Sequence, residues 1–314
     1  MARGSRPCYD ATVRIVSLLP AATEIVAALG MVDQLVGVSH ECDFPAPVKA
    51  LPRVTRCAIH GNALPSTDID RWVKTELERS GTLYTMDEPL LRRLAPEVII
   101  TQRLCDVCAV GFGTVTAFAA TLPGPPQVVN LEPQTLADVY GDVRRVGAAL
   151  GVPERAERVI HQLEARVEQV RARTAGAPTR RCVLLEWIDP PFRSGHWGPE
   201  LVALAGGVDP LGQAGEDAAQ VSWDEVRAVA PEVLVIACCG FDVARTERDV
   251  PILRGYPGFG QLPAAQNDEV WIVDGSAYFS RPGPRLVDSL ELLAPLVHPE
   301  LHAGAPRPVG VAHA

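Results

Sequence analysis

Short apolar runs alternate with longer stretches of helical periodicity along most of the chain. A run of apolar, often β-branched residues predicts a buried strand, and apolar residues three and four positions apart predict an amphipathic helix. Alternating strands and helices are typical of α/β domains with parallel sheets. The strands predicted in this way are residues 13–19, 35–38, 97–101, 127–130, 182–187, 233–237 and 270–273.

Capping residues and turn formers set the bounds of the predicted helices. Thr23 is a candidate N-cap for a helix that ends at Gly30, and Asp87 caps a helix that ends before Pro96. Residues 45–68 are rich in proline and turn formers and predict a loop. The other short helices expected are residues 69–80, 110–121, 135–150, 199–205, 223–230 and 284–297.

The longest predicted helix begins at Pro153 and reaches about Arg173. About 21 residues at about 1.5 Å each span roughly 30 Å, enough to cross between two lobes. One face is dense with Glu and Arg, which is the usual pattern of a solvated surface. The apolar face carries Ala156, Ile160, Leu163, Val167 and Val170.

Two segments of the first half of the chain recur, in the same order, in the second half. Residues 22–35 (ATEIVAALGMVDQL) correspond to 198–211 (GPELVALAGGVDPL), and residues 94–100 correspond to 229–235. Two copies predict two lobes of similar build rather than a solenoid. The expected organisation is an N-terminal extension (1–12), a first lobe (13–134), connecting helices (135–176), a second lobe (177–298) and a disordered tail (299–314).

The composition narrows the classes of partner and compartment. The chain has 314 residues, 47% of them apolar, and a formal net charge of −9 at pH 7. Basic residues do not cluster with aromatics, so we expect no nucleic-acid partner. No apolar stretch precedes the first strand, so we expect neither a secretory signal nor a membrane anchor, and a cytoplasmic location. Eight cysteines are then expected to be thiols or metal ligands rather than disulfides.

The strand at 182–187 runs directly into a polar and aromatic turn. Glu186 and Trp187 end the strand, and Phe192, His196 and Trp197 follow before the next helix. Open α/β sheets bind ligands at the carboxyl ends of their strands, so this turn is a candidate ligand site. The alternative is an ordinary loop with two core tryptophans.

Several motifs in order resemble those of the substrate-binding proteins of ABC importers for cobalamin and ferric siderophores. The resemblance covers the chain from about residue 13 to residue 297, and Asp-Pro-Pro-Phe at 189–192 is closer to the cobalamin branch. The matching residues are Arg14–Pro20 with Thr23 and Glu24, Gly37–Ser39 with Asp43–Pro45, Leu94 with Pro96–Ile99, Asp189–Phe192 with Gly195, and Phe279, Arg281, Pro284 and Arg285.

This resemblance implies a class III periplasmic-binding-protein-like fold, an α/β fold of two Rossmann-like lobes joined by a single long backbone helix. It implies a protein that clamps a small-molecule ligand, cobalamin or a related corrinoid or metal chelate, between its lobes. We expect a monomer, which works with an ABC permease only if it is exported. The residues expected to line the ligand are Glu41, Phe44, Gln102, Arg103, Glu186, Trp187, Phe192, His196, Trp197, Tyr278, Phe279 and Arg281.

Some of these residues have a second interpretation. His196 either ligates the metal of a bound cofactor or is a hydrogen-bonded loop residue. Arg281 and Arg285 either hold a polar group of the ligand or form a salt bridge between the lobes. About half of the aromatic residues are expected in the core. Glu41 and Glu186 have no nucleophile or triad spacing nearby, so we expect a binding protein rather than an enzyme.

A Cys-x-x-Cys motif, Cys105 and Cys108, is the sharpest chemical feature of the first half. With His40 and Cys42 it offers four ligands for zinc or iron, while Cys57 and His60 are further candidates. The alternative is a set of half-buried thiols. This cluster supports a second hypothesis, a cytoplasmic metal- or thiol-dependent protein or enzyme that uses the same cleft.

Overall fold

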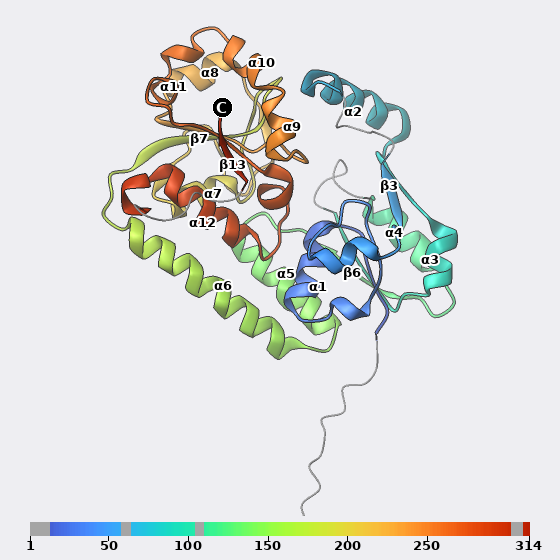
Figure 1. Ribbon diagram of the computed structural model, residues 1–314. Coiled ribbons are helices and arrows are strands. Elements are labelled where there is room, and N and C mark those ends of the chain that lie inside the picture. Colours follow the sequence, from blue (N-terminus) through green and yellow to red (C-terminus); the bar gives the residue numbers. More distant parts are fainter. Residues whose placement is uncertain (1–12, 58–63, 104–109, 303–309) are drawn as a thin grey trace, which may run out of the picture.

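The computed structural model describes residues 13–57, 64–103, 110–302 and 310–314 of the chain. They form two α/β lobes, which lie at opposite ends of a long helix (Figure 1). Among the described residues, no helix combines the length and the apolar character needed to cross a membrane.

A parallel four-stranded sheet with the order β2-β1-β5-β6 forms the centre of the N-terminal lobe. Neighbouring residues of a strand face opposite sides of the sheet. Ile15 therefore packs with α1, whereas Val16 packs with α3 and α4. The elements are β1 (Ile15–Ser17), α1 (Pro20–Ala28), η1 (Val32–Gln34), β2 (Leu35–Val38), η2 (Ala46–Ala50), α3 (Glu88–Leu94), β5 (Val98–Gln102), α4 (Phe112–Ala119) and β6 (Gln127–Leu131).

Helix α1 begins earlier than its predicted N-cap. Pro20 occupies the first turn, where its missing N–H needs no partner. Thr23 is buried inside the helix, and its Oγ1 lies 2.8 Å from Ser17 Oγ. The prediction that Thr23 caps the helix is therefore wrong.

Residues 45–68, predicted as a loop, contain part of a separate antiparallel ribbon. Strand β3 (Thr55–Cys57) pairs with β4 (Tyr84–Met86), and α2 (Ser66–Ser80) lies between them in the sequence. A parallel bridge between Val38 and Arg53 attaches this ribbon to the edge of the main sheet. Figure 1 shows α2 beside the C-terminal lobe, at the far end of the ribbon.

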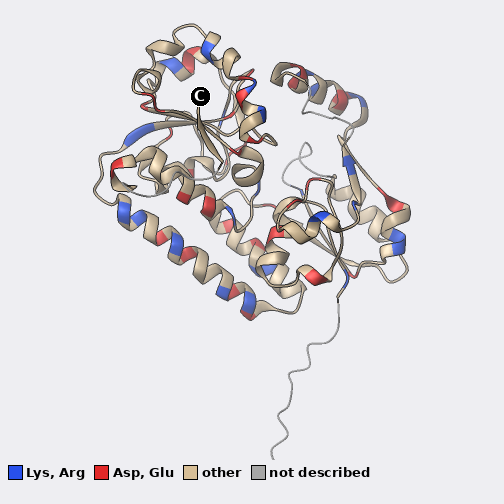
Figure 2. Cartoon of the chain, in the orientation of Figure 1, with Lys and Arg blue, Asp and Glu red and all other residues tan. Residues whose placement is uncertain are grey.

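Two connecting helices contribute to the cores of both lobes. These are α5 (Leu136–Ala149), which starts with a capping box of Thr135 and Asp138, and α6 (Pro153–Thr174). In α6, Ile160 packs in the N-terminal lobe and Leu163 in the C-terminal lobe. Acidic and basic residues follow one another along the outer surface of α6 (Figure 2).

The C-terminal lobe is built on a mixed sheet with the order β10-β8-β7-β11-β12-β13. Strands β7, β11 and β12 are parallel, and β8, β10 and β13 are antiparallel to their neighbours. The elements are β7 (Arg180–Trp187), β8 (Phe192–Arg193), α7 (Gly198–Leu204), β9 (Gly207–Val208), β10 (Ala219–Gln220), α8 (Trp223–Ala228), β11 (Val233–Ile236), α9 (Val243–Glu247), α10 (Val250–Gly255), η4 (Phe259–Gln261), α11 (Pro263–Gln266), β12 (Val270–Val273), the π-helix η5 (Gly275–Phe279), α12 (Leu286–Val297), η6 (Pro299–His302) and β13 (Val311–His313).

The end of the chain differs from the predicted disordered tail at both described parts. Residues Pro299–His302 form η6, and Val311–His313 form β13, which pairs with β12. The ring of His313 lies 3.9 Å from that of Trp271. Strand pairing to a sheet edge orders a segment whose Gly, Pro and Ala composition gives no local signal of structure.

The second internal repeat has the same local structure in both lobes. Ala95 and Ala230 both lie just after a helix and have a φ of 44°. Arg14 donates from Nε to Ala95 O at 2.7 Å, and Arg181 donates from Nε to Ala230 O at 3.0 Å. The Arg14 and Arg181 backbone N–H groups donate to Glu97 and Glu232 at 2.9 and 3.0 Å. This arrangement, called the Arg–Glu clasp below, lies at the amino ends of the central strands.

Candidate functional site between the lobes

Charged residues of both lobes meet between the lobes. Four of them form what is called the inter-lobe charge cluster below: Glu24 and Asp43 from the N-terminal lobe, Arg281 and Arg285 from the C-terminal lobe. Arg281 Nη1 lies 2.5 Å from Asp43 Oδ1 and 3.3 Å from Glu24 Oε1. Arg285 Nη1 lies 3.5 Å from the same Glu24 oxygen. Both arginines thus form salt bridges between the lobes.

Glu24 is the most buried member of the cluster, with a side chain that is 1% exposed. Desolvation raises the pKa of Glu24 to about 7, although Arg281 and Arg285 act in the opposite direction. Its Oε2 atom is buried and has no hydrogen-bond partner among the described residues. The family resemblance includes Glu24 among its matching residues but predicts no role for it. Its signal was a single charge in the otherwise apolar helix PAATEIVAA.

Desolvation also opposes the ionisation of Asp43, yet the Arg281 hydrogen bond lowers the pKa of Asp43 below its usual value. At neutral pH the pair of Asp43 and Arg281 is therefore fully charged. The Asp43 side chain is 52% exposed, so this part of the cluster is open to solvent.

Arg285 lies between aromatic rings of the two lobes. Its guanidinium carbon is 4.4 Å from the centroid of Phe44 and 4.5 Å from that of Tyr278. Such contacts suit a planar cation. Phe44 is still 44% exposed. Phe44, Tyr278 and Arg281, all predicted to line the ligand, are therefore brought together at the inter-lobe charge cluster.

His40, Glu41 and Cys42 follow β2 and have different surroundings. His40 Nδ1 lies 2.8 Å from Thr55 Oγ1, and desolvation lowers the pKa of His40. Burial raises the pKa of Cys42 to about 11, so its thiol is protonated at neutral pH. Desolvation raises the pKa of Glu41 as well, although its side chain is 44% exposed. Of the three, Glu41 has the carboxylate that a ligand can reach.

The predicted metal cluster is only partly within the described residues. Cys105, Cys108 and His60 lie outside them. Within the described part of the chain, no group of three or more His, Cys, Asp and Glu side chains is placed to hold a metal ion. Zinc or iron binding therefore stays a prediction that depends on Cys105 and Cys108.

His196 has a backbone conformation that is rare for a side chain with a Cβ, with a φ of 46°. Its N–H donates to Glu216 O at 2.6 Å, and its ring stacks on Trp197. Its Nδ1 lies 2.5 Å from Oε1 of Gln134, and its Nε2 lies 3.6 Å from Asp217 Oδ1. Desolvation lowers the pKa of His196, so the ring is neutral at pH 7. A proton on Nδ1, donated to Gln134, leaves the Nε2 lone pair available.

Gln102 and Arg103, the predicted residues at the end of β5, differ in exposure. Gln102 is 5% exposed. Arg103 has a side chain that is 71% exposed, and its Nε lies 3.9 Å from Glu132 Oε1. An exposed pair at this distance contributes little, and nothing in the structure assigns Arg103 a binding role.

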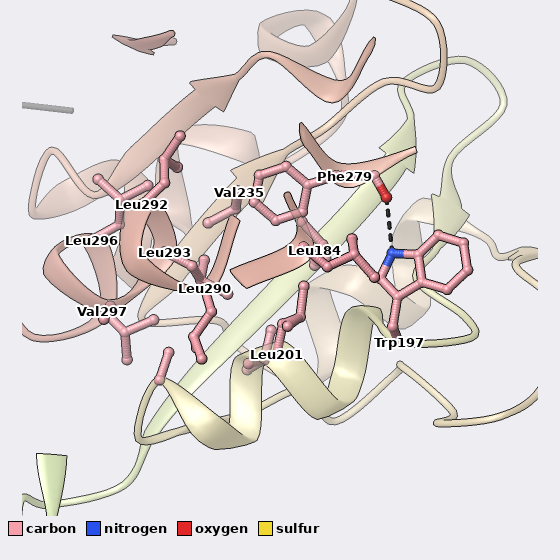
Figure 3. Close-up of a cluster of buried hydrophobic side chains, with 14 of the residues drawn as sticks. Leu184, Trp197, Leu201, Val235, Phe279, Leu290, Leu292, Leu293, Leu296 and Val297 are labelled. Carbon is pink, nitrogen blue, oxygen red and sulfur yellow. Dashed lines mark hydrogen bonds between the residues drawn. The ribbon is translucent and has the colours of Figure 1, made fainter. Parts of the chain in front are cut away.

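Two of the predicted ligand-lining aromatics are packed in the core. Trp197 is 7% and Phe279 5% exposed, within the apolar cluster of α7, α12 and β7. Trp197 Nε1 donates to Phe279 O at 2.8 Å, as Figure 3 shows. Trp187 and Phe192 pair across β7 and β8 and are partly exposed. Packing in the core encloses both rings, and a contact of either ring with the ligand stays a prediction.

Glu186 ends β7 and accepts a hydrogen bond from Gly195 N at 3.0 Å. Desolvation raises its pKa to about 7. The carboxyl group is therefore protonated in the folded protein over a pH range in which it ionises in the unfolded chain. A protonated Glu186 both donates and accepts hydrogen bonds.

This shift predicts how stability depends on pH. Because the folded-state pKa is raised, the contribution of Glu186 is fully present below about pH 4.5 and is lost as the pH rises through about 7. Replacing Glu186 with glutamine should remove up to about 3 kcal/mol of this dependence. Urea unfolding at pH 5 and pH 8 measures it: the variant should gain stability relative to the wild type as the pH rises. A difference that is the same at both pH values would contradict the assignment.

Comparisons with known proteins agree with this architecture. A family model described as "Periplasmic binding protein" matches residues 15–277. The vitamin B12-binding protein of Vibrio cholerae serotype O1 is 25% identical over 288 residues, which cover 88% of this chain and 86% of the relative.

Two solved structures share the fold. The apo periplasmic heme-binding protein RhuT from Roseiflexus sp. RS-1 has a TM-score of 0.70 and 24% identity, covering 93% of this chain and 100% of that one. The periplasmic vitamin B12-binding protein BtuF of Vibrio cholerae has a TM-score of 0.65 and 23% identity, covering 92% and 98%. The predicted class III fold is thereby confirmed. The chain belongs to the periplasmic binding protein family and is a substrate-binding protein of the ABC-transporter type.

Proposed function

We propose that this chain binds cobalamin or a related corrinoid between its two lobes. The observation that carries the proposal is the convergence of polar side chains from both lobes, with Glu41, Asp43 and Phe44 still partly exposed. The similarity to proteins named for vitamin B12 binding supports the same ligand class.

The charge balance between the lobes favours a corrinoid over a haem. Corrinoids carry carboxamide groups around the ring, and these donate hydrogen bonds to carboxylates. Haem carries two carboxylates, which need free cations. The exposed Glu41 is available as an acceptor, whereas Arg281 and Arg285 are already paired with Glu24 and Asp43. A haem carboxylate bound here would be repelled by the acidic side chains between the lobes.

His196 offers a second point of contact. Its neutral ring and free Nε2 lone pair suit a metal centre with an open axial position. A ligand with aqua-cobalt should therefore bind with a change in its visible spectrum, whereas cyanocobalamin, whose axial position is blocked, should bind without that change.

The test is a titration of the purified protein with aquacobalamin, cyanocobalamin and haemin, followed by visible absorption and calorimetry. We expect both corrinoids to be retained through desalting and haemin to bind more weakly. Glu41→Ala should weaken corrinoid binding by about tenfold, as the loss of a charged hydrogen bond predicts. The control Glu154→Ala changes an exposed acid at the start of α6 and should have no effect. Haemin binding without corrinoid binding would overturn the proposal.

A further inference from the structure

Helix α2 belongs to the N-terminal lobe by sequence and by its ribbon, but its first turns are packed on the C-terminal lobe. Ile69 is 8% exposed and belongs to the same apolar cluster as Leu185, Ile188 and Trp223. Val73, one helical turn further on, packs against this cluster too. An apolar residue of one lobe is therefore buried in the core of the other.

Two hydrogen bonds fix the same segment to the C-terminal lobe. Thr67 Oγ1 donates to Asp189 Oδ2. Arg245 Nη2 donates to Leu64 O at 2.6 Å, and Arg245 is held by Asp249 at 3.1 Å. Asp249 belongs to the C-terminal lobe, so Arg245 is held in place within its own lobe and does not depend on the segment for its position.

Asp189 is a rigid acceptor. Tyr256 Oη lies 3.2 Å from Asp189 Oδ1, and Trp187 Nε1 donates to Asp189 O at 3.1 Å. Hydrogen bonds to a preorganised, charged acceptor are stronger than average. This gives the Thr67 hydroxyl a larger effect than a surface threonine has.

The contact lies at the carboxyl ends of the strands. Asp189 follows β7, and Arg245 follows β11. Open α/β sheets bind ligands at this edge. Figure 1 shows α2 on the side of the molecule away from α6. The lobes are therefore connected on two sides, by α5 and α6 on one and by α2 on the other.

We propose that residues 64–73, called the strap below, tie the two lobes together on the side opposite α6 and detach when the lobes open. The two connections are unequal. Helices α5 and α6 contribute several residues to each core, including Leu136, Val143, Ile160 and Leu163. The strap contributes Ile69, Val73 and two hydrogen bonds. The weaker connection opens first.

Detachment of the strap has a consequence for ligand entry, and this consequence alone depends on the proposed function. The polar face between the lobes becomes accessible from the strap's side when the lobes separate, and docking of the strap encloses what has bound. Residues of the strap then influence the rates of binding and release.

The test uses the full chain and needs no ligand. Arg71, Lys74 and Arg79 are exposed trypsin sites on α2. We compare the wild type, Thr67→Ala, the double variant Thr67→Ala/Ile69→Ala, and the control Thr75→Ala, whose hydroxyl donates to Arg71 O on its own helix. Cleavage within α2 is followed by mass spectrometry, and the radius of gyration is measured by small-angle X-ray scattering.

We expect Thr67→Ala to speed cleavage within α2 by about tenfold, with a larger increase and a larger radius of gyration for the double variant. Thr75→Ala should behave as the wild type. Equal cleavage in Thr67→Ala and Thr75→Ala would overturn the proposal. Faster cleavage with an unchanged radius of gyration would also overturn it, because the strap would then dock without restraining the lobes. Failure of corrinoid binding would count against the proposed function and leave these readouts unaffected.

Discussion

Replacing Arg281 with methionine is expected to lower the free energy of unfolding by about 3–5 kcal/mol at pH 8. The guanidinium is 7% exposed and pairs with Glu24, whose side chain is 1% exposed. Methionine fills similar space but leaves the Glu24 carboxylate buried without its main partner. Above its pKa of about 7, Glu24 is ionised, so the loss is larger at pH 8 than at pH 5.

A double-mutant cycle with Glu24→Gln separates the buried charge from the loss of packing. In the Glu24→Gln background, Arg281→Met should cost about 1–3 kcal/mol less than in the wild type, because no buried carboxylate then loses its partner. Asp43 loses Arg281 in both backgrounds, but its side chain is 52% exposed. Arg144→Met is the matched control: Arg144 pairs with Glu157 on the surface and should change stability by less than about 1 kcal/mol. Urea unfolding of all variants provides the measurement. A loss at Arg281 no larger than that at Arg144 would contradict the assigned role of the inter-lobe charge cluster.

Replacing Trp197 with alanine is expected to cost about 3–5 kcal/mol of unfolding free energy. The indole is packed among residues such as Leu201, Leu290 and Phe279 and donates a hydrogen bond to the Phe279 carbonyl (Figure 3). Truncation leaves a cavity in the core and an unpaired carbonyl oxygen. Trp197→Phe keeps most of the volume and should cost about 1–3 kcal/mol, chiefly for the hydrogen bond.

The same pair of variants distinguishes a core residue from a wall of the ligand site. As a core residue, Trp197 can be changed to phenylalanine with no loss of ligand affinity once the protein is folded. As a wall, Trp197→Ala would keep its stability within about 1 kcal/mol and lose affinity by an order of magnitude. Thermal unfolding together with ligand titration decides between these results.

Much of the fold could be predicted because its signals are local. The apolar runs at 35–38 and 270–273, predicted as strands, match β2 and β12. They could be recognised because strands buried in a parallel sheet are apolar on both faces. The helix predicted to begin at Pro153 matches α6. It could be recognised because a helix that packs into the cores of both lobes has a continuous apolar face. The repeated Ala-Pro-Glu segments correctly indicate two lobes of similar build.

The candidate site was less predictable because its contacts join distant residues. Arg281 and Glu24 are 257 positions apart in the sequence. Neither residue type nor spacing indicates that they meet, so the sequence left Arg281 between a ligand contact and a salt bridge. The strap was missed for the same reason: Thr67 and Asp189 are separated by 122 positions. Tryptophan and phenylalanine occur in cores and at ligand sites alike, and only packing assigned Trp197 and Phe279 to the core.

The Arg–Glu clasp occupies the amino ends of the central strands in both lobes, and the charged residues that meet between the lobes lie beyond their other ends. At the amino ends the two sheets share one local structure, whereas beyond the other ends each lobe contributes different side chains to the inter-lobe charge cluster. Substitutions near Arg14 or Arg181 affect how a lobe is built, whereas substitutions near Glu41 or His196 affect what lies between the lobes. A scaffold divided in this way can acquire a different ligand while its framework stays the same, since the two ends change independently.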